Sequence, residues 1–413
     1  MRLPFCFGDP MPDHLMNTYL PLPVSFTHGE GAWLFDANGN RYLDALGGIA
    51  VCALGHAHPA ITQAICDQAG RLLHSSNLYQ IDNQNTLADV LCEKAGMERV
   101  FFSNSGAEAN EAALKLARLY GHQKGIDNPQ VIVTEGSFHG RTMATLTATG
   151  NRKIQAGFEP LVPGFLRAPY NDTEALRTIA GNSPDVVAIL VEPITGEGGI
   201  RIPDENYLST IRGLCDEHGW LMMLDEIQTG MGRTGTLWAC EEYGIVPDIL
   251  TFGKAFGGGV MPITGIIARP HLWTEELQEN PWVLGSPTFG GNPLACSAAI
   301  AAIKFSVEND LPGQIKEKGD YFMQKLAELR KKYKILVDVR GKGFLIGLEY
   351  PTPEMGWAVS KGLFKRGVLT GGTLNNAKVN RIEPPGIIRY ETIDLVIQRL
   401  DDTLTEVAEE HHT

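Results

Sequence analysis

The sequence predicts an α/β protein with two parts: a large domain built on a mostly parallel sheet covered by helices, and a smaller α+β domain. The middle of the chain alternates short apolar runs with segments of helical spacing. Within it, Val186–Val191 is an unbroken apolar run, typical of a strand buried on both faces of a sheet. From about Leu311 the chain changes to a charged helical segment followed by short strands.

Near the N-terminus the sequence has a hairpin-like pattern. Ala32–Phe35 and Tyr42–Leu46 are predicted strands, and the Asn38-Gly39 pair between them favours a tight turn. We expect this hairpin to pack with the C-terminal part of the chain.

In the central region, predicted strands and helices follow one another in turn. Residues 107–120 and 207–218 have the apolar spacing of helices. The predicted strands are Val100–Phe102, Val131–Val133, Val186–Val191, Trp220–Leu224, Ile249–Phe252 and Ile263–Ala268. This alternation implies a mostly parallel sheet.

The C-terminal region is predicted to hold two helices and two strands. They are the helices Gln314–Lys332 and Thr392–Ala408, of which the second is amphipathic, and the strands Ile335–Val339 and Phe344–Glu349. We therefore expect an N-terminal segment of residues 1–50 that packs with the small domain, a large domain of residues 51–308 and a small domain of residues 309–413.

The composition limits the kinds of partner that the chain is expected to bind. Of its 413 residues 43% are hydrophobic and 20% charged, and the net charge of −13 argues against a general nucleic-acid binder. Because no apolar stretch reaches membrane-spanning length and Met1–Pro10 lacks a long apolar core, we expect neither a membrane span nor a signal peptide. The seven cysteines are scattered without a CxxC pair, which favours reduced thiols in a cytoplasmic protein over disulfides or a metal site.

Two polar residues follow apolar strands and point to a shared chemistry. Asp225 directly follows the predicted strand 220–224, and Lys254 follows the strand 249–252 after one glycine. A carboxylate can hold a pyridine nitrogen protonated, and an amine can form a Schiff base with an aldehyde. An acid and a lysine so placed can grip the two ends of one planar cofactor, which is the chemistry of pyridoxal 5′-phosphate (PLP).

Another strand is followed by a segment suited to binding an anion. Residues 103–108, Ser-Asn-Ser-Gly-Ala-Glu, join a predicted strand to a helix, so the free N–H groups of the helix start and the Ser105 hydroxyl can hold a phosphate. Taken alone, such a segment is more often an ordinary helix start, with Ser105 as N-cap and Glu108 completing a capping box. The two interpretations are compatible, because both use the same exposed donors.

Further polar residues follow other strands. In Phe138-His139-Gly140-Arg141 the phenyl ring can lie flat on a cofactor and the guanidinium can bind a carboxylate, although a packed aromatic, a structural histidine and a solvated arginine are the plainer interpretation. Glu192 ends a predicted strand, and Glu197 lies in the following loop. Ligands collect at the carboxyl ends of parallel strands, so the joint placement of these residues with Asp225 and Lys254 is harder to explain by chance than any one alone.

Together these segments resemble the class III, ornithine-type aminotransferases of the PLP fold-type I superfamily. The resemblance covers nearly the whole length and rests on the set rather than on a single motif. The matching segments are G-E-G from Gly29, L-G-H from Leu54, S-N-S-G-A-E-A-N-E-A-A from Ser103, F-H-G-R-T from Phe138, E-P-I-T-G-E-G-G from Glu192, L-D-E-I-Q-T-G-M-G-R-T-G from Leu224, P-D-I-L from Pro247, F-G-K-A-F-G-G-G from Phe252 and T-F-G-G-N-P-L-A from Thr288. The resemblance implies an aspartate-aminotransferase-like large domain and a small domain formed from both termini.

The resemblance also implies a role for each matching residue. Lys254 would bond to the cofactor aldehyde and later move a proton between substrate and cofactor, while Asp225 would pair with the pyridinium nitrogen. Gln228 would contact the ring hydroxyl, and Thr288 would reach the phosphate across a homodimer interface. The expected cofactor contacts are Ser105, Gly106 and Ala107 at the phosphate, Phe138 on the ring face, and His139, Glu192, Asp225, Gln228, Lys254 and Thr288 around them. A homodimer is then the smallest active unit, and its pairing into a tetramer stays open.

The family further implies how one site accepts two substrates. A glutamate covers an arginine while a terminal amine is the donor, and it moves away when 2-oxoglutarate brings a carboxylate. The matching residues are Glu197 and Arg381, and Arg141 would hold the distal carboxylate.

The resemblance divides between two subgroups. Residues 138–142 and 47–59 resemble acetylornithine aminotransferases, whereas residues 372–385 and 257–263 resemble putrescine aminotransferases. The expected activity moves a terminal amine from an N-acetylornithine, ornithine or diamine donor to 2-oxoglutarate or pyruvate. The alternatives are an ω-amino acid:pyruvate transaminase, a mutase, decarboxylase or racemase on the same scaffold, and a catalytically silent metabolite-binding or interaction protein.

Overall fold

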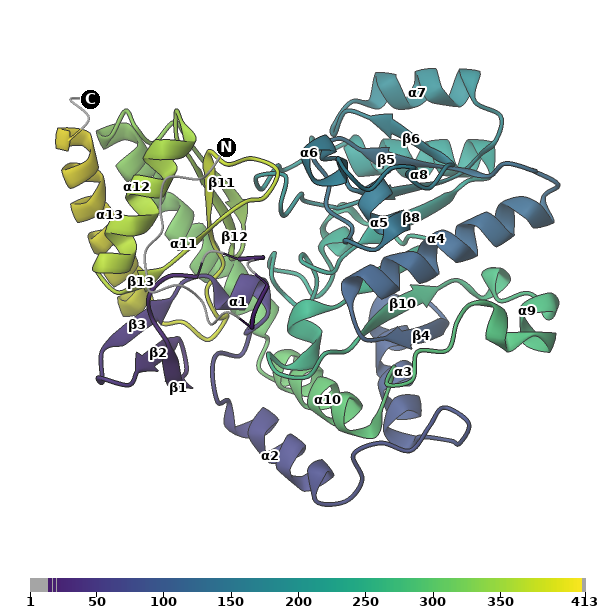
Figure 1. The fold of residues 1–413 in the computed structure, drawn as a ribbon, viewed down its shortest axis with the longest axis horizontal. Helices are drawn as coiled ribbons and strands as arrows, with labels where there is room; N and C mark the ends of the chain where they lie inside the picture. Colours follow the sequence, from purple (N-terminus) through teal and green to yellow (C-terminus); the bar gives the residue numbers. More distant parts are fainter. Residues whose placement is uncertain (1–13, 17, 20, 411–413) are drawn as a thin grey trace.

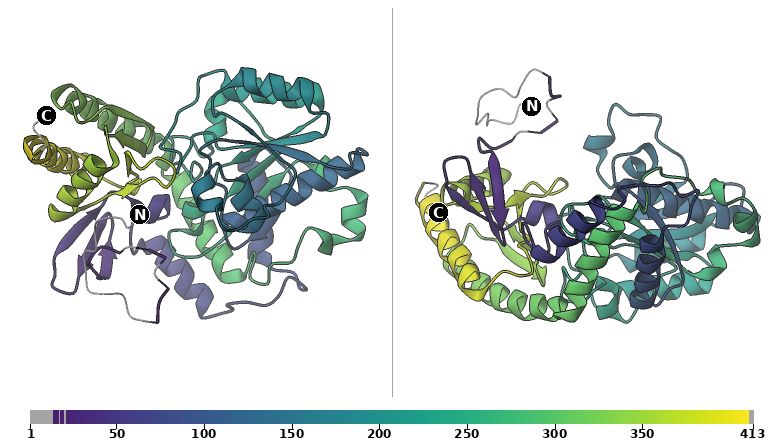
Figure 2. Two further views of the ribbon diagram at one scale, coloured as in Figure 1. Left: turned by 45° about the horizontal axis from the view of Figure 1, so that its top comes forward. Right: turned by 90° about the horizontal axis from the view of Figure 1, so that it is seen from below.

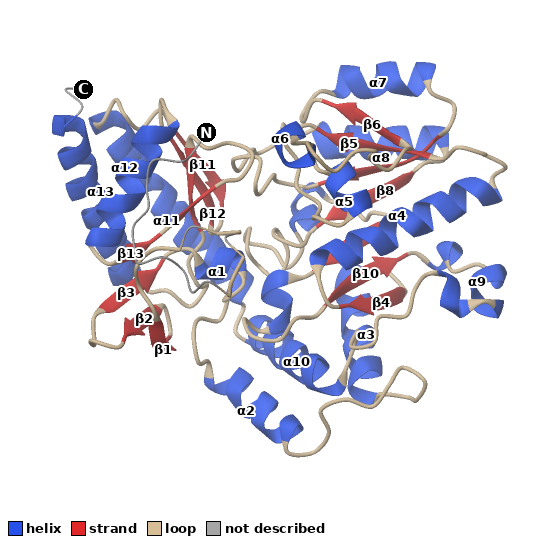
Figure 3. Cartoon of the chain, viewed as in Figure 1, coloured by secondary structure: helices blue, strands red, loops and turns tan. Residues whose placement is uncertain are grey.

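The computed structural model describes residues 14–16, 18, 19 and 21–410, so the predictions for Met1–Pro10 and Cys6 lie outside these residues. The chain folds into two lobes (Figures 1 and 2). One lobe holds the largest sheet, and the other holds the strands and helices nearest both termini. Figure 3 shows helices beside the strands in both lobes.

The largest sheet has seven strands in the order β4-β10-β9-β8-β7-β5-β6. Their bounds are β4 Arg99–Ser103, β5 Gln130–Thr134, β6 Phe165–Ala168, β7 Val186–Val191, β8 Leu221–Asp225, β9 Ile249–Phe252 and β10 Thr264–Ala268. Strands β9, β8, β7, β5 and β6 pair in parallel, while β10 pairs antiparallel with both β4 and β9. The carboxyl ends of β4 and of the five parallel strands therefore share one edge of the sheet.

Both faces of this sheet are buried under helices. On β8, Leu221 and Met223 pack in the cluster that contains α4 (Gly106–Gln123), while Met222 and Leu224 pack in the cluster that contains α8 (Tyr207–His218). Each such side chain stabilises the fold by roughly 1.5–3 kcal/mol when it leaves water. This packing on both faces holds the carboxyl ends of the strands in place.

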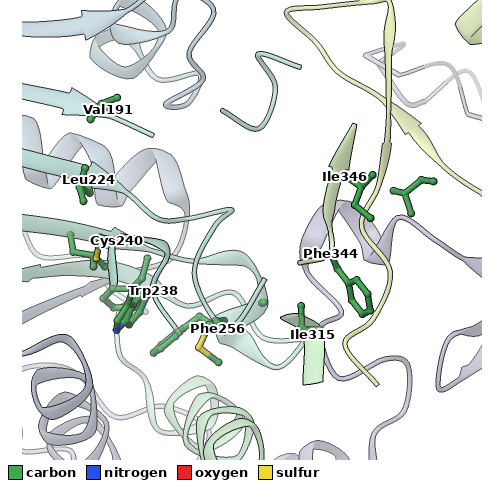
Figure 4. Close-up of a cluster of buried hydrophobic side chains, with 14 of the residues drawn as sticks. Val191, Leu224, Trp238, Cys240, Phe256, Ile315, Phe344 and Ile346 are labelled. Carbon is green, nitrogen blue, oxygen red and sulfur yellow. The ribbon is translucent and has the colours of Figure 1, made fainter. Parts of the chain in front are cut away.

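The apolar core continues from the large lobe into the smaller one. Figure 4 shows side chains of one buried cluster, whose members pack together without a break. The labelled members are Val191, Leu224, Trp238, Cys240, Phe256, Ile315, Phe344 and Ile346.

Two smaller sheets lie in the second lobe. Strands β1 (Phe26–Glu30), β2 (Trp33–Asp36) and β3 (Arg41–Asp44) form an antiparallel meander, and β13 (Val368–Leu369) pairs in parallel with β3. The other sheet is antiparallel with the order β11-β12-β15-β14, and its bounds are β11 Asp338–Lys342, β12 Leu345–Glu349, β14 Gly371–Gly372 and β15 Val379–Ile382. The N-terminal hairpin thus shares a sheet with C-terminal residues.

The remaining helices connect and cover these sheets. They are α1 Gly47–Ala50, α2 Pro59–Ala69, α3 Asp82–Ala95, α5 Met143–Ala148, α6 Arg152–Gln155, α7 Thr173–Asn182, α9 Glu275–Glu279, α10 Pro293–Glu308, α11 Leu311–Lys332, α12 Pro353–Lys365 and α13 Tyr390–Glu410, with the 3-10 helices η1 Ala239–Tyr243, η2 Lys254–Gly257, η3 Pro270–Leu272 and η4 Pro281–Val283. Within the described ranges no helix combines the length and the apolar character needed to cross a bilayer.

The predicted α/β class is confirmed, and strands 186–191 and 249–252 and helix 207–218 agree with β7, β9 and α8 residue for residue. The predicted strand Ile335–Val339 is wrong in its first part. Ile335 and Leu336 are buried in a turn closed by the Leu336 N–H on the Tyr333 carbonyl at 3.1 Å, and the strand begins at Asp338. Buried turns and strands both accept a short apolar run, so the pattern could not separate them.

The predicted strand 42–46 also ends early. The Asp44 carboxylate accepts the backbone N–H groups of Leu46 and Gly47 at 3.1 and 2.8 Å, and this local turn ends β3 at Asp44.

Candidate functional site

The carboxyl edge of the large sheet brings most of the predicted residues together. Asp225 is the last residue of β8, and Lys254 follows β9 after Gly253. The hydroxyl of Thr264 donates to the Ser105 carbonyl at 2.9 Å, and a Cβ on Gly106 would lie 2.9 Å from Ile227. The start of α4 therefore packs directly against the loop that follows Asp225.

The Asp225 carboxylate is buried and held from several sides. Its Oδ2 accepts a hydrogen bond from Nδ2 of Asn110 at 2.8 Å and lies 2.8 Å from Nδ1 of His139. Its Oδ1 accepts the backbone N–H of Ile227 at 3.1 Å. Since an ionised carboxylate only accepts, this arrangement requires the proton on Nδ1 of His139. The negative charge is thus fixed in orientation at the sheet edge.

Lys254 begins η2 in a conformation that few side chains adopt. Its φ is +50°, in the left-handed region, where a residue with a Cβ is strained. Its Nζ makes no hydrogen bond or ion pair with any residue that the structure describes. Burial lowers the pKa of Lys254, although Glu383 and Glu197 oppose the shift. A lysine with a lowered pKa is a better nucleophile near neutral pH.

The start of α4 offers unpaired donors. The Ser105 hydroxyl accepts the Glu108 N–H at 3.2 Å as the N-cap, while the Glu108 carboxylate accepts the backbone N–H of Asn104 at 2.7 Å. The capping-box interpretation therefore holds with a shift of one residue. Within the described chain the N–H groups of Ser105, Gly106 and Ala107 meet no acceptor, and such groups at a helix start attract anions.

Glu192 supports the loop that carries Phe138. Its carboxylate accepts the backbone N–H groups of Phe138 and Gly196 at 3.1 and 3.0 Å. Burial raises the pKa of Glu192 to about 7, with His139 opposing the shift. On the solvent side of this loop the Arg141 guanidinium lies 5.8 Å from the centre of the Phe138 ring.

Glu197 and Arg381 form a buried ion pair, with 2.6 Å between Oε1 and Nη1 and exposed fractions of 5% and 3%. Arg381 also donates to the Gly372 carbonyl from Nε and Nη2 at 3.1 and 2.9 Å. The second oxygen of Glu197 accepts the Leu374 N–H at 2.9 Å. The Glu197 carboxylate therefore covers the Arg381 guanidinium, which is the closed form of this pair.

Two site residues escaped the sequence analysis. Asn110 lies one helical turn after Gly106 in the quoted S-N-S-G-A-E-A-N segment, and that spacing was the available signal. Glu383 accepts a hydrogen bond from Nε2 of Gln228, and its position two residues after Arg381 was the signal, because alternate residues of a strand share a face.

Thr288 lies apart from these residues. It is exposed in the loop before α10, where the side chain of Asn77 donates to the carbonyls of Pro287 and Gly290 at 3.4 and 3.0 Å. It shares no hydrogen bond with the other predicted site residues, all of which the structure describes.

A family model described as Aminotransferase class-III matches residues 15–404. The chain belongs to the class III aminotransferases. It is 50% identical over 340 residues to the acetylornithine aminotransferase of Nitrosomonas europaea, covering 82% of this chain and 85% of that one. It is 44% identical to the acetylornithine aminotransferase of Caldanaerobacter subterraneus, over 95% of this chain and 98% of that one.

Solved structures agree with this membership. An ornithine aminotransferase from Toxoplasma gondii matches with a TM-score of 0.92 at 34% identity, over 97% of this chain and 94% of that chain. The acetylornithine aminotransferase of Elizabethkingia anophelis matches with a TM-score of 0.83 at 32% identity, over 95% and 96% of the two chains.

As a class III aminotransferase the protein transfers an amino group from an amine donor to a 2-oxo acid and uses PLP as its cofactor. Three features of the sheet edge fit that cofactor. The fixed carboxylate of Asp225 suits a protonated ring nitrogen, the buried amine of Lys254 suits an aldehyde, and the unpaired N–H groups at residues 105–107 suit a phosphate.

Proposed function

We propose that this aminotransferase moves the terminal amino group of an N-acetylornithine- or ornithine-type donor to 2-oxoglutarate. The observation that carries this proposal is the buried pair of Glu197 and Arg381. A guanidinium covered by a neighbouring carboxylate can be uncovered for a substrate carboxylate and closed again for a donor without one at that place. The identity of up to 50% with acetylornithine aminotransferases supports the same donor class.

When bound, PLP supplies the aldehyde that takes up the amino group and the ring that withdraws electrons from the substrate carbon. Lys254 would provide the amine that bonds to this aldehyde, and its Nζ would serve as the base that removes the proton from the donor's terminal carbon. Asp225, oriented by His139 and Asn110, keeps the ring nitrogen protonated.

The remaining residues orient the cofactor and the substrates. The N–H groups of Ser105, Gly106 and Ala107 bind the phosphate, as expected at a helix start. Phe138, on a loop that Glu192 supports, would cover one face of the ring, and Gln228 would donate to the ring hydroxyl. The exposed Arg141 binds the distal carboxylate of the substrate.

We further propose a homodimer in which Thr288 contacts the phosphate bound by the partner subunit. Exposed apolar side chains on two neighbouring loops support this proposal: Leu72, Leu73, Leu78, Tyr79, Trp282, Val283 and Phe289. The loops meet where the rings of His74 and Phe289 lie 5.1 Å apart. Apolar surface of this kind marks a protein interface.

Two wider proposals follow from the sequence. The division into residues 1–50, 51–308 and 309–413 is supported by the sheet that β3 and β13 share. A cytoplasmic location is supported by the free thiols of the six described cysteines.

A diamine donor is the second candidate, because residues 372–385 resemble putrescine aminotransferases. The deciding experiment measures kcat/KM for N-acetylornithine, ornithine, putrescine, 4-aminobutyrate and β-alanine, each with 2-oxoglutarate or pyruvate. We expect the highest value for N-acetylornithine with 2-oxoglutarate. A clear preference for putrescine, β-alanine or pyruvate would reject the proposal and favour the diamine or ω-amino acid alternative.

Two controls belong to this experiment. Lys254→Ala abolishes turnover, and Arg381→Ala raises the KM for 2-oxoglutarate while the half-reaction with the donor persists. Conversion of the cofactor to its amine form on adding the donor alone separates transamination from a mutase, decarboxylase or racemase. A wild-type protein that never develops visible absorption with PLP would be a silent binding protein instead.

A further inference from the structure

We propose that Glu383 is a positioning residue of this site: its carboxyl group holds the Gln228 side chain so that an N–H, and not the amide oxygen, is presented to the ring hydroxyl of the cofactor. This inference rests on the proposed function, because the ring hydroxyl belongs to bound PLP. The sequence resemblance predicted neither the pairing of Glu383 with Gln228 nor the orientation of the Gln228 amide.

Glu383 is anchored at the end of β15. Its side chain is fully buried, and its backbone N–H donates to the Ala45 carbonyl at 2.7 Å. A Cβ on Gly47 would lie 2.7 Å from the Glu383 carbonyl oxygen, so the N-terminal segment packs tightly against this residue. The carboxyl group has little freedom to move away.

Gln228 is clamped between two neighbours. Its Nε2 donates to Oε1 of Glu383, and its Oε1 lies so close to Gly196 that a Cβ there would overlap it. An ionised carboxylate can only accept, so this contact selects the NH2 end of the amide. One of the two N–H groups on Nε2 is used by Glu383, and the other remains for a second acceptor.

Charged groups surround this contact from three elements. Lys254 lies on η2, Arg381 on β15 and Arg233 on the loop after β8, and Glu383 acts electrostatically on all three. Glu197 and Asp225 are the other carboxylates that act on Lys254. The second oxygen of Glu383, Oε2, is buried without a hydrogen-bond partner among the described residues. This carboxyl group therefore acts electrostatically on the reacting lysine, and its buried oxygen without a partner distinguishes it from an apolar filler of the core.

β15 and the residue directly after it thus support two loops. Arg381 and Glu383 lie at alternate positions, and they hold Glu197 in the loop after β7 and Gln228 in the loop after β8. The C-terminal sheet sets the geometry of both residues.

The test is a double-mutant cycle on PLP affinity. Glu383→Ala, Gln228→Ala and the double variant are compared with wild type by the Kd of PLP for the apoenzyme and by the visible absorption maximum of the bound cofactor. Because Glu383 acts through Gln228, each single variant weakens PLP binding about tenfold, and the double variant is no weaker than Gln228→Ala. The absorption maximum shifts in the same direction in both single variants, and Glu383→Gln, whose side-chain oxygen can accept the same hydrogen bond, restores most of the affinity.

Asn380→Ala is the matched control, since Asn380 is buried on the same strand but donates to the Gly356 carbonyl at 2.8 Å. It leaves PLP affinity unchanged. Glu383→Leu keeps the volume and removes the acceptor, so it carries the same prediction if Glu383→Ala does not fold. Wild-type PLP affinity in the Glu383→Ala and Glu383→Leu variants overturns the inference. So do losses of affinity in the two single variants that multiply in the double variant. Either result leaves the proposed function standing. Absence of visible absorption or turnover in the wild type overturns the proposed function instead.

Discussion

At the scale of single residues, the chemistry of Asp225 depends on partners that are distant in the sequence. The residue itself could be predicted, because an acid at the end of a buried strand stands out. Asn110 and His139, which orient it at 2.8 Å each, come from α4 and from the loop after β5. Their approach is set by helix and strand packing, which no local pattern encodes.

Asp225→Asn tests this carboxylate. The variant keeps the shape but removes the charge that we pair with the ring nitrogen, so kcat falls about 10²–10³-fold, as for the loss of one preorganised electrostatic group. Stopped-flow absorbance of the donor half-reaction measures the effect. Asp248→Asn at the opposite end of β9 is a control, because Asp248 pairs with Arg212 at 2.7 Å and not with the site. A rate for Asp225→Asn within a few-fold of wild type would contradict the role.

Glu192 makes the folded protein sensitive to pH. Burial raises its pKa to about 7 from an ordinary value of 4.5, so between these values the folded state holds a proton that the unfolded chain has lost. The stabilisation from this group is present below about pH 4.5 and is lost as the pH rises through about 7.

Glu192→Gln removes this titration. Relative to wild type, the variant therefore gains stability between pH 5 and pH 8, by roughly 2–3 kcal/mol. Thermal unfolding of both proteins at the two pH values measures the difference in stability between variant and wild type. Because all other groups titrate alike in both proteins, their contributions cancel in this difference. An offset between variant and wild type that is equal at both pH values would show that Glu192 keeps an ordinary pKa.

At the scale of elements, the start of α4 serves the fold and the site together. Its S-N-S-G-A-E sequence predicted both a cap and an anion site, and Ser105 is the N-cap. What the sequence could not predict is the close packing of Gly106 on Ile227, which brings the helix start beside Asp225.

Ser105→Ala separates the two contributions of that residue. Loss of the cap costs about 1 kcal/mol of stability, and loss of the hydroxyl weakens PLP binding. Ser209→Ala in α8 is a control, because this exposed hydroxyl donates to the Asn206 carbonyl at a helix start and makes no hydrogen bond with a predicted site residue in the part of the chain that the structure describes. Denaturant unfolding and PLP titration give the two quantities. If Ser105→Ala lowered stability without weakening PLP binding, the hydroxyl would be a cap only.

At the scale of the whole molecule, the α/β class and the positions of the main strands along the chain followed from the sequence, while the order of the strands in the sheet and the relation between the lobes did not. The unbroken run of β7 and the alternation of strands and helices predicted the sheet. The antiparallel direction of β10 and the tether from Glu383 to Gln228 depend on how distant segments pack. Such contacts are properties of the tertiary structure, because no local sequence pattern connects the two segments that meet.

The assembly gives a prediction at this scale. Phe289→Asp places a charge among the exposed apolar side chains of the loops at 72–79 and 282–289, so the dimer dissociates and activity falls with it. Light scattering after size-exclusion chromatography measures the mass. Val246→Asp changes an exposed apolar residue elsewhere and leaves the mass unchanged. A wild-type protein that is monomeric and fully active would disprove the shared site.

The most direct test concerns the bond between Lys254 and the cofactor aldehyde. The holoenzyme is reduced with borohydride, digested and mapped by mass spectrometry. We predict a pyridoxyl group on Lys254 and on no other lysine, and no modified peptide from Lys254→Ala. Modification of a different lysine, or none in an active wild-type enzyme, would contradict the assignment of Lys254 and with it the site built around Asp225.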